Sequence, residues 1–524
     1  MDEMNNQVPN WQGYPPPQYG PPPYYYPPAP PKITYPTGKG ELIFGAVILL
    51  FSLLVCNCLL FAGANLGFGI AILGILAASA VYLWSRGHRF DWYTGSLLFL
   101  CAVITAGFGR SDDAGMKFLM VLALMLVPGL IFCVVSGQNR RSPAGFLSLL
   151  DSPRATFLFG FGRMGEAGRG LGQAFRSTGT VGKKGGAVAL GLLIAVPVVA
   201  IVVPLLMSAD AAFEGLLDLL PEFELRELVT TVIFGGGLGW ILYVRGVALH
   251  HTVKPPETAK KAAKGLHPLT VNTVLFAVAL VYVAYLLSQL AYFVGGFSGI
   301  LPEDFTMAEY ARRGFFEMGW LCAINLGIIA LAVGLVRKDE KASLLTRLVC
   351  LFLGLITVFL VATASAKMLM YIGSYGLTRA RVMTEVFMLW LAASTIFVCV
   401  WLFRPKLPYM KLTLLLGLTL CAALFWADVD SQVARYNVRA YQDGRLKTVD
   451  VDYLGTLSSG AVPWLEELVE DEDEKISNQA WNTLSCYYLN DTEDIRSWNY
   501  ARARAEGLLA LYQPEAYGET EDLP

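Results

Sequence analysis

Long apolar runs alternate with short polar segments between residues 42 and 426 of the chain. A helix needs about 20 apolar residues to cross the hydrocarbon layer of a bilayer, and most of the runs reach or approach that length. The third and the last are short, with about 17 residues, the low end of the accepted range. The sequence therefore predicts an all-α, polytopic transmembrane helix bundle of about eleven spans, at residues 42–61, 67–84, 93–109, 118–137, 187–207, 228–249, 269–293, 316–336, 344–366, 386–403 and 410–426.

The polar segments between these runs alternate in charge. Basic residues follow each even-numbered run, as Arg86 and Arg89 do after the second and Arg404 and Lys406 after the tenth. The segments after the odd-numbered runs are acidic or mixed, as at Asp112. Because basic loops stay on the cytoplasmic side, the alternation predicts a cytoplasmic N-terminus and an extracytoplasmic C-terminus. We expect a multi-pass protein of the cytoplasmic cell membrane.

Two regions flank the predicted bundle. Residues 1–41 are rich in Pro and Tyr, a composition that favours extended chain and cannot bury a core, so we predict a disordered cytoplasmic tail. Its simplest interpretation is a solvated spacer, and the alternative is a docking arm for a protein partner. Residues 427–524 hold 20 acidic and 8 basic residues. We expect them to form an acidic α-helical extracytoplasmic region of three or four short helices, a second place for protein partners.

One helix of that region has a definite pattern. Its apolar residues recur at helical spacing, and Thr492 precedes them as a candidate cap. The residues that carry the pattern are Ile495, Trp498, Ala505, Leu508, Leu509 and Tyr512.

Composition supports a membrane protein and narrows the chemistry. The 524 residues are 55% hydrophobic and 16% charged, against about 25% charged in soluble domains. A net charge of −2 argues against nucleic acid as a partner, which leaves the lipid bilayer as the expected surroundings. Only Cys486 of the nine cysteines lies in a polar segment, and the four histidines are scattered along the sequence. We therefore expect no disulfide framework, no metal site and no cofactor.

One glycine motif and a few polar residues stand out. Residues 160–165 (GFGRMG) match a dinucleotide-binding pattern, but the cytoplasmic loop that holds them is too short for a nucleotide domain, and position 185, where such a site needs an acidic residue, is a glycine. Within the apolar runs we find no carboxylates at mid-membrane, and ion relays need such groups. The amides of Asn57, Asn272, Gln289 and Asn325 are more typical of hydrogen bonds between helices.

One group of polar residues gathers at the predicted outer face. It comes from the segment before the eighth span, from the link between the ninth and tenth, and from the segment after the eleventh. These residues could line a mostly cationic, outward-facing pocket. An ordinary ring of interfacial side chains is the simpler interpretation, and we favour it. The residues are Arg312, Arg313, Glu317, Lys367, Tyr371, Arg379, Arg381, Glu385, Arg435 and Tyr436. None of them forms a recognisable catalytic or metal-binding set.

Four segments resemble a family of bacterial multi-pass membrane proteins catalogued only as a domain of unknown function. They are residues 208–213 (SADAAF), 307–317 (MAEYARRGFFE), 375–382 (YGLTRARV) and 433–438 (VARYNV). The resemblance covers roughly residues 180–512 and implies a bacterial cytoplasmic membrane, but it implies no activity.

Three functions are compatible with these observations. The favoured one is a non-enzymatic sensor, scaffold or assembly factor of the cell envelope. The alternatives are a transporter of a small polar or anionic solute and a membrane-embedded transferase with an outward-facing polar site. A bundle with the C-terminal region folded over its outer face favours the first. A deep outer groove with a paired acid and base would favour the enzyme.

Overall fold

The computed structural model describes residues 35–139, 153–177, 202, 225–252, 266–297, 315–335, 343–489 and 494–513, and across these residues the regular structure is helical. This confirms the all-α transmembrane bundle. The helices of the apolar part are α1 (Lys39–Asn57), which continues as the π-helical turn η1 (Cys58–Ala62), α2 (Leu66–Ser85), α3 (Trp92–Gly107), α4 (Ala114–Val135), α10 (Leu225–His251), α11 (Pro268–Phe297), α13 (Phe315–Leu335), α14 (Leu344–Tyr375), α15 (Arg379–Phe403) and α16 (Tyr409–Ala427). The turn η3 (Arg154–Leu158) and the helices α6 (Phe159–Phe161) and α7 (Met164–Ser177) lie between α4 and α10 in the sequence.

Ten of the predicted spans coincide with these helices. Eight described helices are long and apolar enough to cross a membrane, and shorter apolar helices lie at Trp92–Gly107 and Met318–Val333. The predicted fifth span, residues 187–207, lies outside the described residues apart from Val202, which is helical. The total of eleven therefore stays a prediction.

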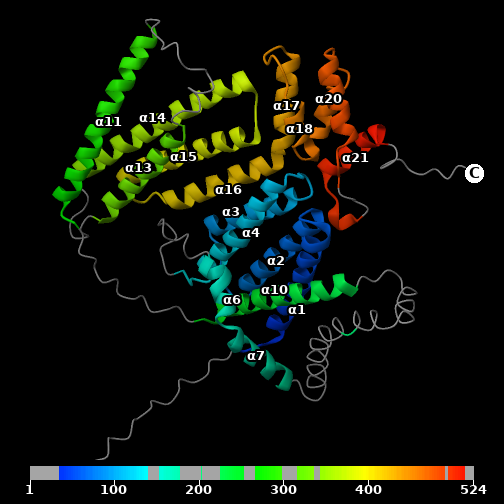
Figure 1. Cartoon of the computed structure of the whole chain (residues 1–524). Coiled ribbons are helices and arrows are strands. Elements are labelled where there is room, and N and C mark those ends of the chain that lie inside the picture. Colours follow the sequence, from blue (N-terminus) through cyan, green and yellow to red (C-terminus); the bar gives the residue numbers. More distant parts are fainter. Residues whose placement is uncertain are drawn as a thin grey trace, which may run out of the picture.

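The apolar helices are organised around two cores. The first core is formed by α1, α2, α3, α4 and α10 together with one face of α16, and the second by α11, α13, α14 and α15. The helix α16 packs against both α15 and α3, so it connects the two groups (Figure 1). The first core is tight where small residues allow backbones to approach: a Cβ added to Gly69 would collide with the carbonyl of Thr105, and one added to Gly235 would lie 2.7 Å from the Cα of Leu53.

Polar side chains inside the bundle form hydrogen bonds between helices, as the sequence predicts for three of the four amides. In the second core the hydroxyl of Tyr282 donates to Asn325 at 2.7 Å, and Asn325 donates to Thr357 at 3.0 Å. The hydroxyl of Thr346 donates to Asn272 at 2.7 Å. The amide of Asn57 donates to α10, and the side chain of Gln289 lies outside the described residues.

Beyond α16 the chain forms a third core of short helices. These are α17 (Val429–Gln442), α18 (Val451–Gly455), η4 (Ser459–Ala461), α19 (Val462–Glu466), α20 (Glu474–Ser485) and α21 (Tyr500–Tyr512), and the short turn η5 (Ile495–Ser497) lies outside this core. The last helix begins later than its apolar pattern predicts. Its cap is Asn499, whose side chain accepts a hydrogen bond from the N–H of Ala501 at 3.0 Å, and the predicted cap Thr492 lies outside the described residues.

The C-terminal helices all lie at one end of the bundle (Figure 1). The two ends of α1 define the ends of the bundle. Asn57, the last residue of α1, contacts Arg496 of the C-terminal region, and we call the end of the bundle where this contact lies the capped end. Glu41, in the first turn of α1, pairs with Arg86 at the opposite end. Segments after the first, third, fifth and ninth predicted spans contact the C-terminal region, and the charge pattern assigns all four of these segments to one side.

Candidate functional site

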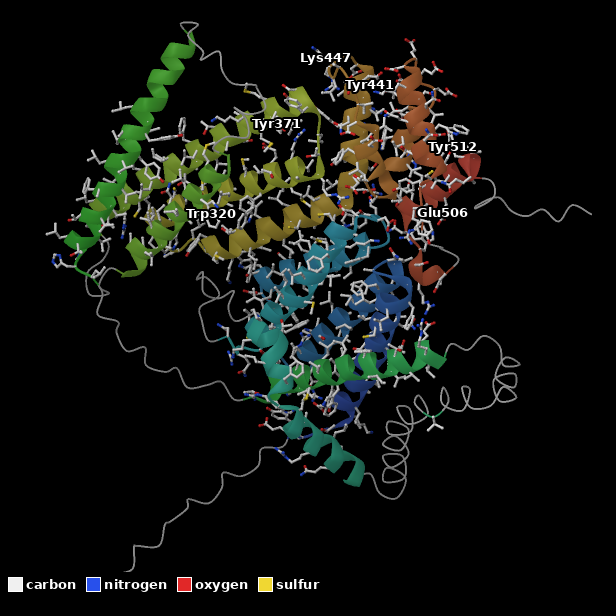
Figure 2. The ribbon with its side chains drawn as sticks, viewed as in Figure 1. Trp320, Tyr371, Tyr441, Lys447, Glu506 and Tyr512 are labelled. Atoms are coloured by element: carbon white, nitrogen blue, oxygen red, sulfur yellow. The ribbon has the colours of Figure 1, made fainter. Side chains whose placement is uncertain are left out.

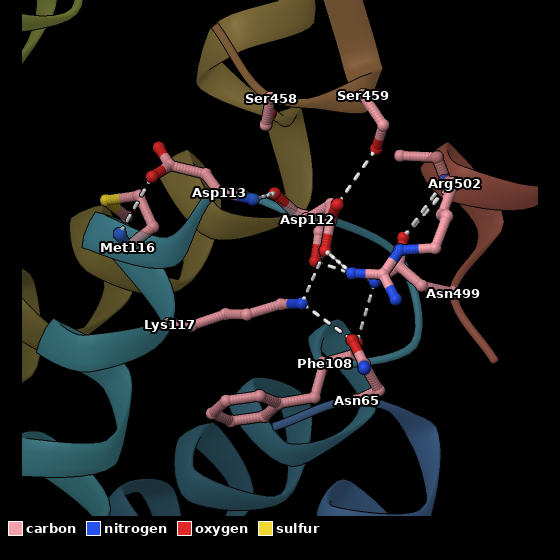
Figure 3. A network of polar contacts seen from close by, with 12 residues as sticks. Asn65, Phe108, Asp112, Asp113, Met116, Lys117, Ser458, Ser459, Asn499 and Arg502 are labelled. Carbon is pink, nitrogen blue, oxygen red and sulfur yellow. Dashed lines mark hydrogen bonds and ion pairs between the residues drawn. The ribbon is translucent and has the colours of Figure 1, made fainter. Parts of the chain in front are cut away.

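The carboxylate of Asp112, in the loop between α3 and α4, contacts three other elements. Its Oδ1 accepts a hydrogen bond from the ammonium of Lys117 at 2.9 Å and another from the guanidinium of Arg502 at 3.0 Å. Its Oδ2 accepts one from the hydroxyl of Ser459 at 3.2 Å. Lys117 belongs to α4, Arg502 to α21 and Ser459 to η4. One carboxylate therefore ties the membrane bundle to the C-terminal region at two places (Figure 3).

This charged group is largely shielded from water. The side chains of Asp112, Lys117 and Arg502 are only 12%, 11% and 12% exposed. Removing one partner from such a pair leaves an uncompensated buried charge, which typically costs about 3–5 kcal/mol. Burial disfavours the ionised form of Asp112, but Lys117 and Arg502 outweigh that effect and hold the pKa of this carboxyl below its usual range.

Two asparagines extend the contact to neighbouring backbone. The amide of Asn499 donates to the carbonyls of Phe108 at 3.1 Å and Ser111 at 2.8 Å, so the residue that caps α21 also holds the α3–α4 loop. Lys117 donates a second hydrogen bond to the side chain of Asn65 at 2.6 Å, immediately before α2 begins. The α3–α4 loop is thus held by Asn499 at the start of α21, and Lys117, which pairs with Asp112 of this loop, is held by Asn65.

Arg379, the first residue of α15, brings the second core into the network. Its guanidinium binds both carboxylate oxygens of Asp430 in α17, with 2.8 Å between Nε and Oδ1. The same Nε lies 3.5 Å from Oδ2 of Asp113. Asp113 also caps α4, because its Oδ1 accepts hydrogen bonds from the N–H groups of Gly115 at 2.9 Å and Met116 at 3.1 Å.

The link between α14 and α15 is held from the same side. The side chain of Asn437 in α17 accepts a hydrogen bond from the N–H of Leu377 at 2.6 Å and donates one to its carbonyl at 2.8 Å. The hydroxyl of Tyr453 accepts from the N–H of Arg379 at 2.9 Å. Both groups of membrane helices are therefore attached to the C-terminal region by side chains of that region.

Asp428 forms the corner between α16 and α17. It adopts a left-handed conformation with φ of 55°, which Asp tolerates better than most residues. Its side chain accepts a hydrogen bond from the hydroxyl of Ser111 at 3.3 Å, and the Cα of Gly460 approaches it so closely that there is no room for a Cβ. Burial, and then the charge of nearby Asp430, raise the pKa of Asp428 to about 6. The same two causes raise the pKa of Asp113.

The predicted outer cluster is divided among several contacts. Arg381 lies with its guanidinium carbon 4.2 Å from the ring centroid of Tyr371 and caps the end of α14 by donating to its carbonyls, while Arg379 turns towards α17. On α17, Arg435 lies 5.8 Å from the ring of Trp464, and Tyr436 lies beneath Arg445 at 5.7 Å.

The remaining predicted residues are spread along the second group of helices. Glu385 in α15 accepts a hydrogen bond from the hydroxyl of Ser365 at 2.5 Å, and Lys367 lies on α14. Arg312, Arg313 and the side chain of Glu317 lie outside the described residues, so a pocket that includes them stays a prediction.

Sequence reasoning missed the centre of the network. The predicted fourth span starts at residue 118, so it leaves out Lys117, and Arg502 looks like any exposed charge of a polar helix. The available signal was the doublet of Asp112 and Asp113 with a lysine five residues after the first aspartate, at the start of an apolar run. That spacing places acid and base at the same helix end.

Three of the four histidines also lie together, although they are scattered along the sequence. At the end opposite the C-terminal region, Nε2 of His88 lies 3.3 Å from Nδ1 of His250. The neighbouring ring of His251 stacks on Tyr35, with its Nε2 3.8 Å from Glu41. Even so, no group of three His, Cys, Asp or Glu side chains among the described residues is arranged to hold a metal ion.

The charged groups at the capped end are engaged with one another. The carboxylates of Asp112 and Asp430 have both oxygens engaged by donors from other elements, and Arg379 is engaged by two carboxylates. These hydrogen bonds and ion pairs hold the helices together.

A family described as a domain of unknown function (DUF4153) matches the chain over residues 49–468. The match begins earlier and ends earlier than the roughly 180–512 that the resemblance of four segments indicates. It takes in most of the first core, the second core, and the contacts of Asp112 with Lys117 and Ser459 but not with Arg502. No curated protein and no solved structure matches the chain.

The pKa values at the corner predict how stability depends on pH. Folding raises the pKa of Asp428 from 3.8 to about 6. Its contribution to the free energy of unfolding is therefore fully present below the pKa of the unfolded chain, and it is lost as pH rises through about 6. Asp113 acts in the same direction, whereas Asp112, whose pKa is lowered, loses its contribution only in more acid solution. We therefore expect Asp428 to contribute about 1 kcal/mol more to the stability of the purified protein at about pH 5 than at about pH 7.5.

The test is the thermal unfolding midpoint at both pH values for the wild type and for Asp428→Asn. Asparagine tolerates the left-handed backbone and can still accept from Ser111, so the variant should fold and lose the part of the pH dependence that Asp428 supplies. Asp443→Asn, at an exposed ion pair, is the control. An unchanged pH dependence in Asp428→Asn would show that the corner does not titrate as described.

Proposed function

The chain belongs to the family described as a domain of unknown function (DUF4153), and from that premise we propose that it is a non-enzymatic scaffold, sensor or assembly factor of the cell envelope. The observation that supports this proposal is the contact of Asp112 with both Lys117 and Arg502. It fixes an extramembrane helical region onto one end of a membrane bundle. Such an arrangement presents a surface at a constant position relative to the bilayer, which is what a partner-binding protein needs.

The part of the C-terminal region farthest from the bundle is acidic. The helix α17 starts beside the bundle, and Tyr441 lies near its other end. The 13 residues from Val429 to Tyr441 span about 20 Å of helix. The hydroxyl of Tyr441 lies 3.2 Å from Asp471, which places the turn between α19 and α20 at that distant end (Figure 2). The turn carries the exposed acidic residues Glu467, Glu470, Glu472, Asp473 and Glu474. A protein partner with a basic surface is the class that this turn would attract.

The charge pattern supports an extracytoplasmic position for this region in a bacterial cytoplasmic membrane. The opposite end of the bundle carries Arg86, His88 and Arg163, and the C-terminal region has an excess of acidic residues. This is the distribution that the positive-inside rule describes.

The partner proposal is tested by in-cell crosslinking of the full-length chain. We expect a discrete crosslinked adduct that is lost in Glu470→Gln/Glu472→Gln, since two of the attracting charges are gone. The matched control is Asp443→Asn/Asp452→Asn, which removes the same charge at exposed sites outside the turn and should keep the adduct. Both variants should match the wild type in abundance and melting temperature. Equal loss of the adduct in both variants, or no adduct even with the wild type, would contradict the proposal. Solute uptake by reconstituted vesicles would favour a transporter instead.

The orientation is tested with the thiol of Cys486. This is the only exposed cysteine of the described residues, and it follows α20 in the C-terminal region. A membrane-impermeant maleimide should label it in intact spheroplasts, and Cys486→Ser should abolish the label. Labelling that requires permeabilisation would place the C-terminal region in the cytoplasm.

A further inference from the structure

One segment of the C-terminal region lies along the ends of the membrane helices. We call residues 494–500 the rim segment. The guanidinium of Arg496 reaches Asn57 at the end of α1 and pairs with Glu227 at the start of α10, at 2.6 Å. Further along, the carbonyl of Trp498 accepts a hydrogen bond from the N–H of Leu66, the first residue of α2, at 3.3 Å. The segment therefore crosses the capped end at the level where three membrane helices begin or end.

Arg110, which contacts both Trp426 and Tyr500, indicates the depth of Tyr500, the last residue of the rim segment. Arg110, just after α3, donates a hydrogen bond from Nε to the carbonyl of Trp426 at 2.7 Å. Its guanidinium carbon lies 6.0 Å from the ring of Trp426 and 5.7 Å from the ring of Tyr500. Trp426 belongs to the last turn of α16, so Tyr500 lies at the level where that span ends. Tryptophan and tyrosine are enriched at this depth in membrane proteins, because their rings are amphipathic.

The apolar side chains of the rim segment are turned outward and leave the third core. Ile495 is 81% exposed, Trp498 41% and Tyr500 50%, although the helical pattern of the sequence groups the first two with core residues. Close by, Leu59 and Leu60 of η1 are 47% and 48% exposed on the surface that the bundle presents to lipid. The exposed apolar side chains of the rim segment thus lie near exposed apolar side chains at the end of the first membrane helix.

We propose that the rim segment is a membrane-interface anchor, with Ile495, Trp498 and Tyr500 inserted into the interfacial layer of the bilayer at the capped end. The occupant of this surface is lipid. The backbone contacts to α2 and the α3–α4 loop fix the height of the segment, and Arg496 pairs with both Glu227 and Asp494, which offsets part of the charge that is brought to the interface. The C-terminal region would then be attached to the membrane directly as well as through Asp112. This inference does not depend on the proposed partner.

The anchor is tested by fluorescence quenching of the full-length chain in phosphatidylcholine nanodiscs. The exposed thiol is removed by Cys486→Ser, and a small fluorophore is attached at Ile495→Cys, a substitution that an 81% exposed side chain should tolerate. A lipid with a nitroxide near the headgroup should quench this label several-fold more strongly than iodide does. The internal comparison is Lys447→Cys, at the tip beyond α17, which should show the reverse (Figure 2).

Leu60→Cys serves as the lipid-facing reference and shows that the chain is inserted. If Ile495→Cys resembles Lys447→Cys, the rim segment lies in water and the proposal is wrong. If it is protected from both quenchers, a protein surface covers it, and the assignment to lipid is also wrong. Neither result would affect the partner experiment, which concerns the acidic turn at the other end of α17.

Discussion

The carboxylate of Asp112 lies where little water reaches it. Two charged groups converge on it, one from the neighbouring helix α4 and one from α21 near the other end of the sequence. An isolated buried carboxylate is costly, so its position depends on Lys117 and Arg502 as much as theirs depends on it. This mutual requirement fixes the α3–α4 loop. That loop in turn holds Asp113 beside Arg379, and Arg379 carries the second group of membrane helices into the same arrangement.

Two separately packed groups of membrane helices are thereby attached to one small helical region. Without these contacts, α16 and its interface with α3 would be the principal connection between the two groups among the described residues. The third core by itself is small, and regions of that size bury only a modest apolar area. The charged contacts and the proposed lipid contact of the rim segment supply the attachment that its own core does not. Asp428 is the part of this arrangement that is most sensitive to pH, because it is a buried carboxylate near those of Asp430 and Asp113.

The sequence predicted the membrane helices well because lipid imposes a simple rule on them: a spanning segment must be long, apolar and helical. Charge alternation likewise assigned to one side the four described loop segments that contact the C-terminal region. The network around Asp112 could not be predicted in the same way. Arg502 lies 390 residues beyond Asp112, and no local pattern indicates such a pairing. Ile495 and Trp498 fit a helical core pattern, but the helix begins only at Tyr500, since Asn499 caps it.

Hydrogen–deuterium exchange on Asp112→Asn in nanodiscs tests the central claim most directly. If one carboxylate holds both α4 and α21, the substitution should speed amide exchange in the first turn of α4 and in α21 together, by at least about tenfold, given the usual cost of an unpaired buried charge. Exchange that changes only in α4, or that matches the Asp443→Asn control in both helices, would contradict the claim that Asp112 joins the C-terminal region to the membrane bundle.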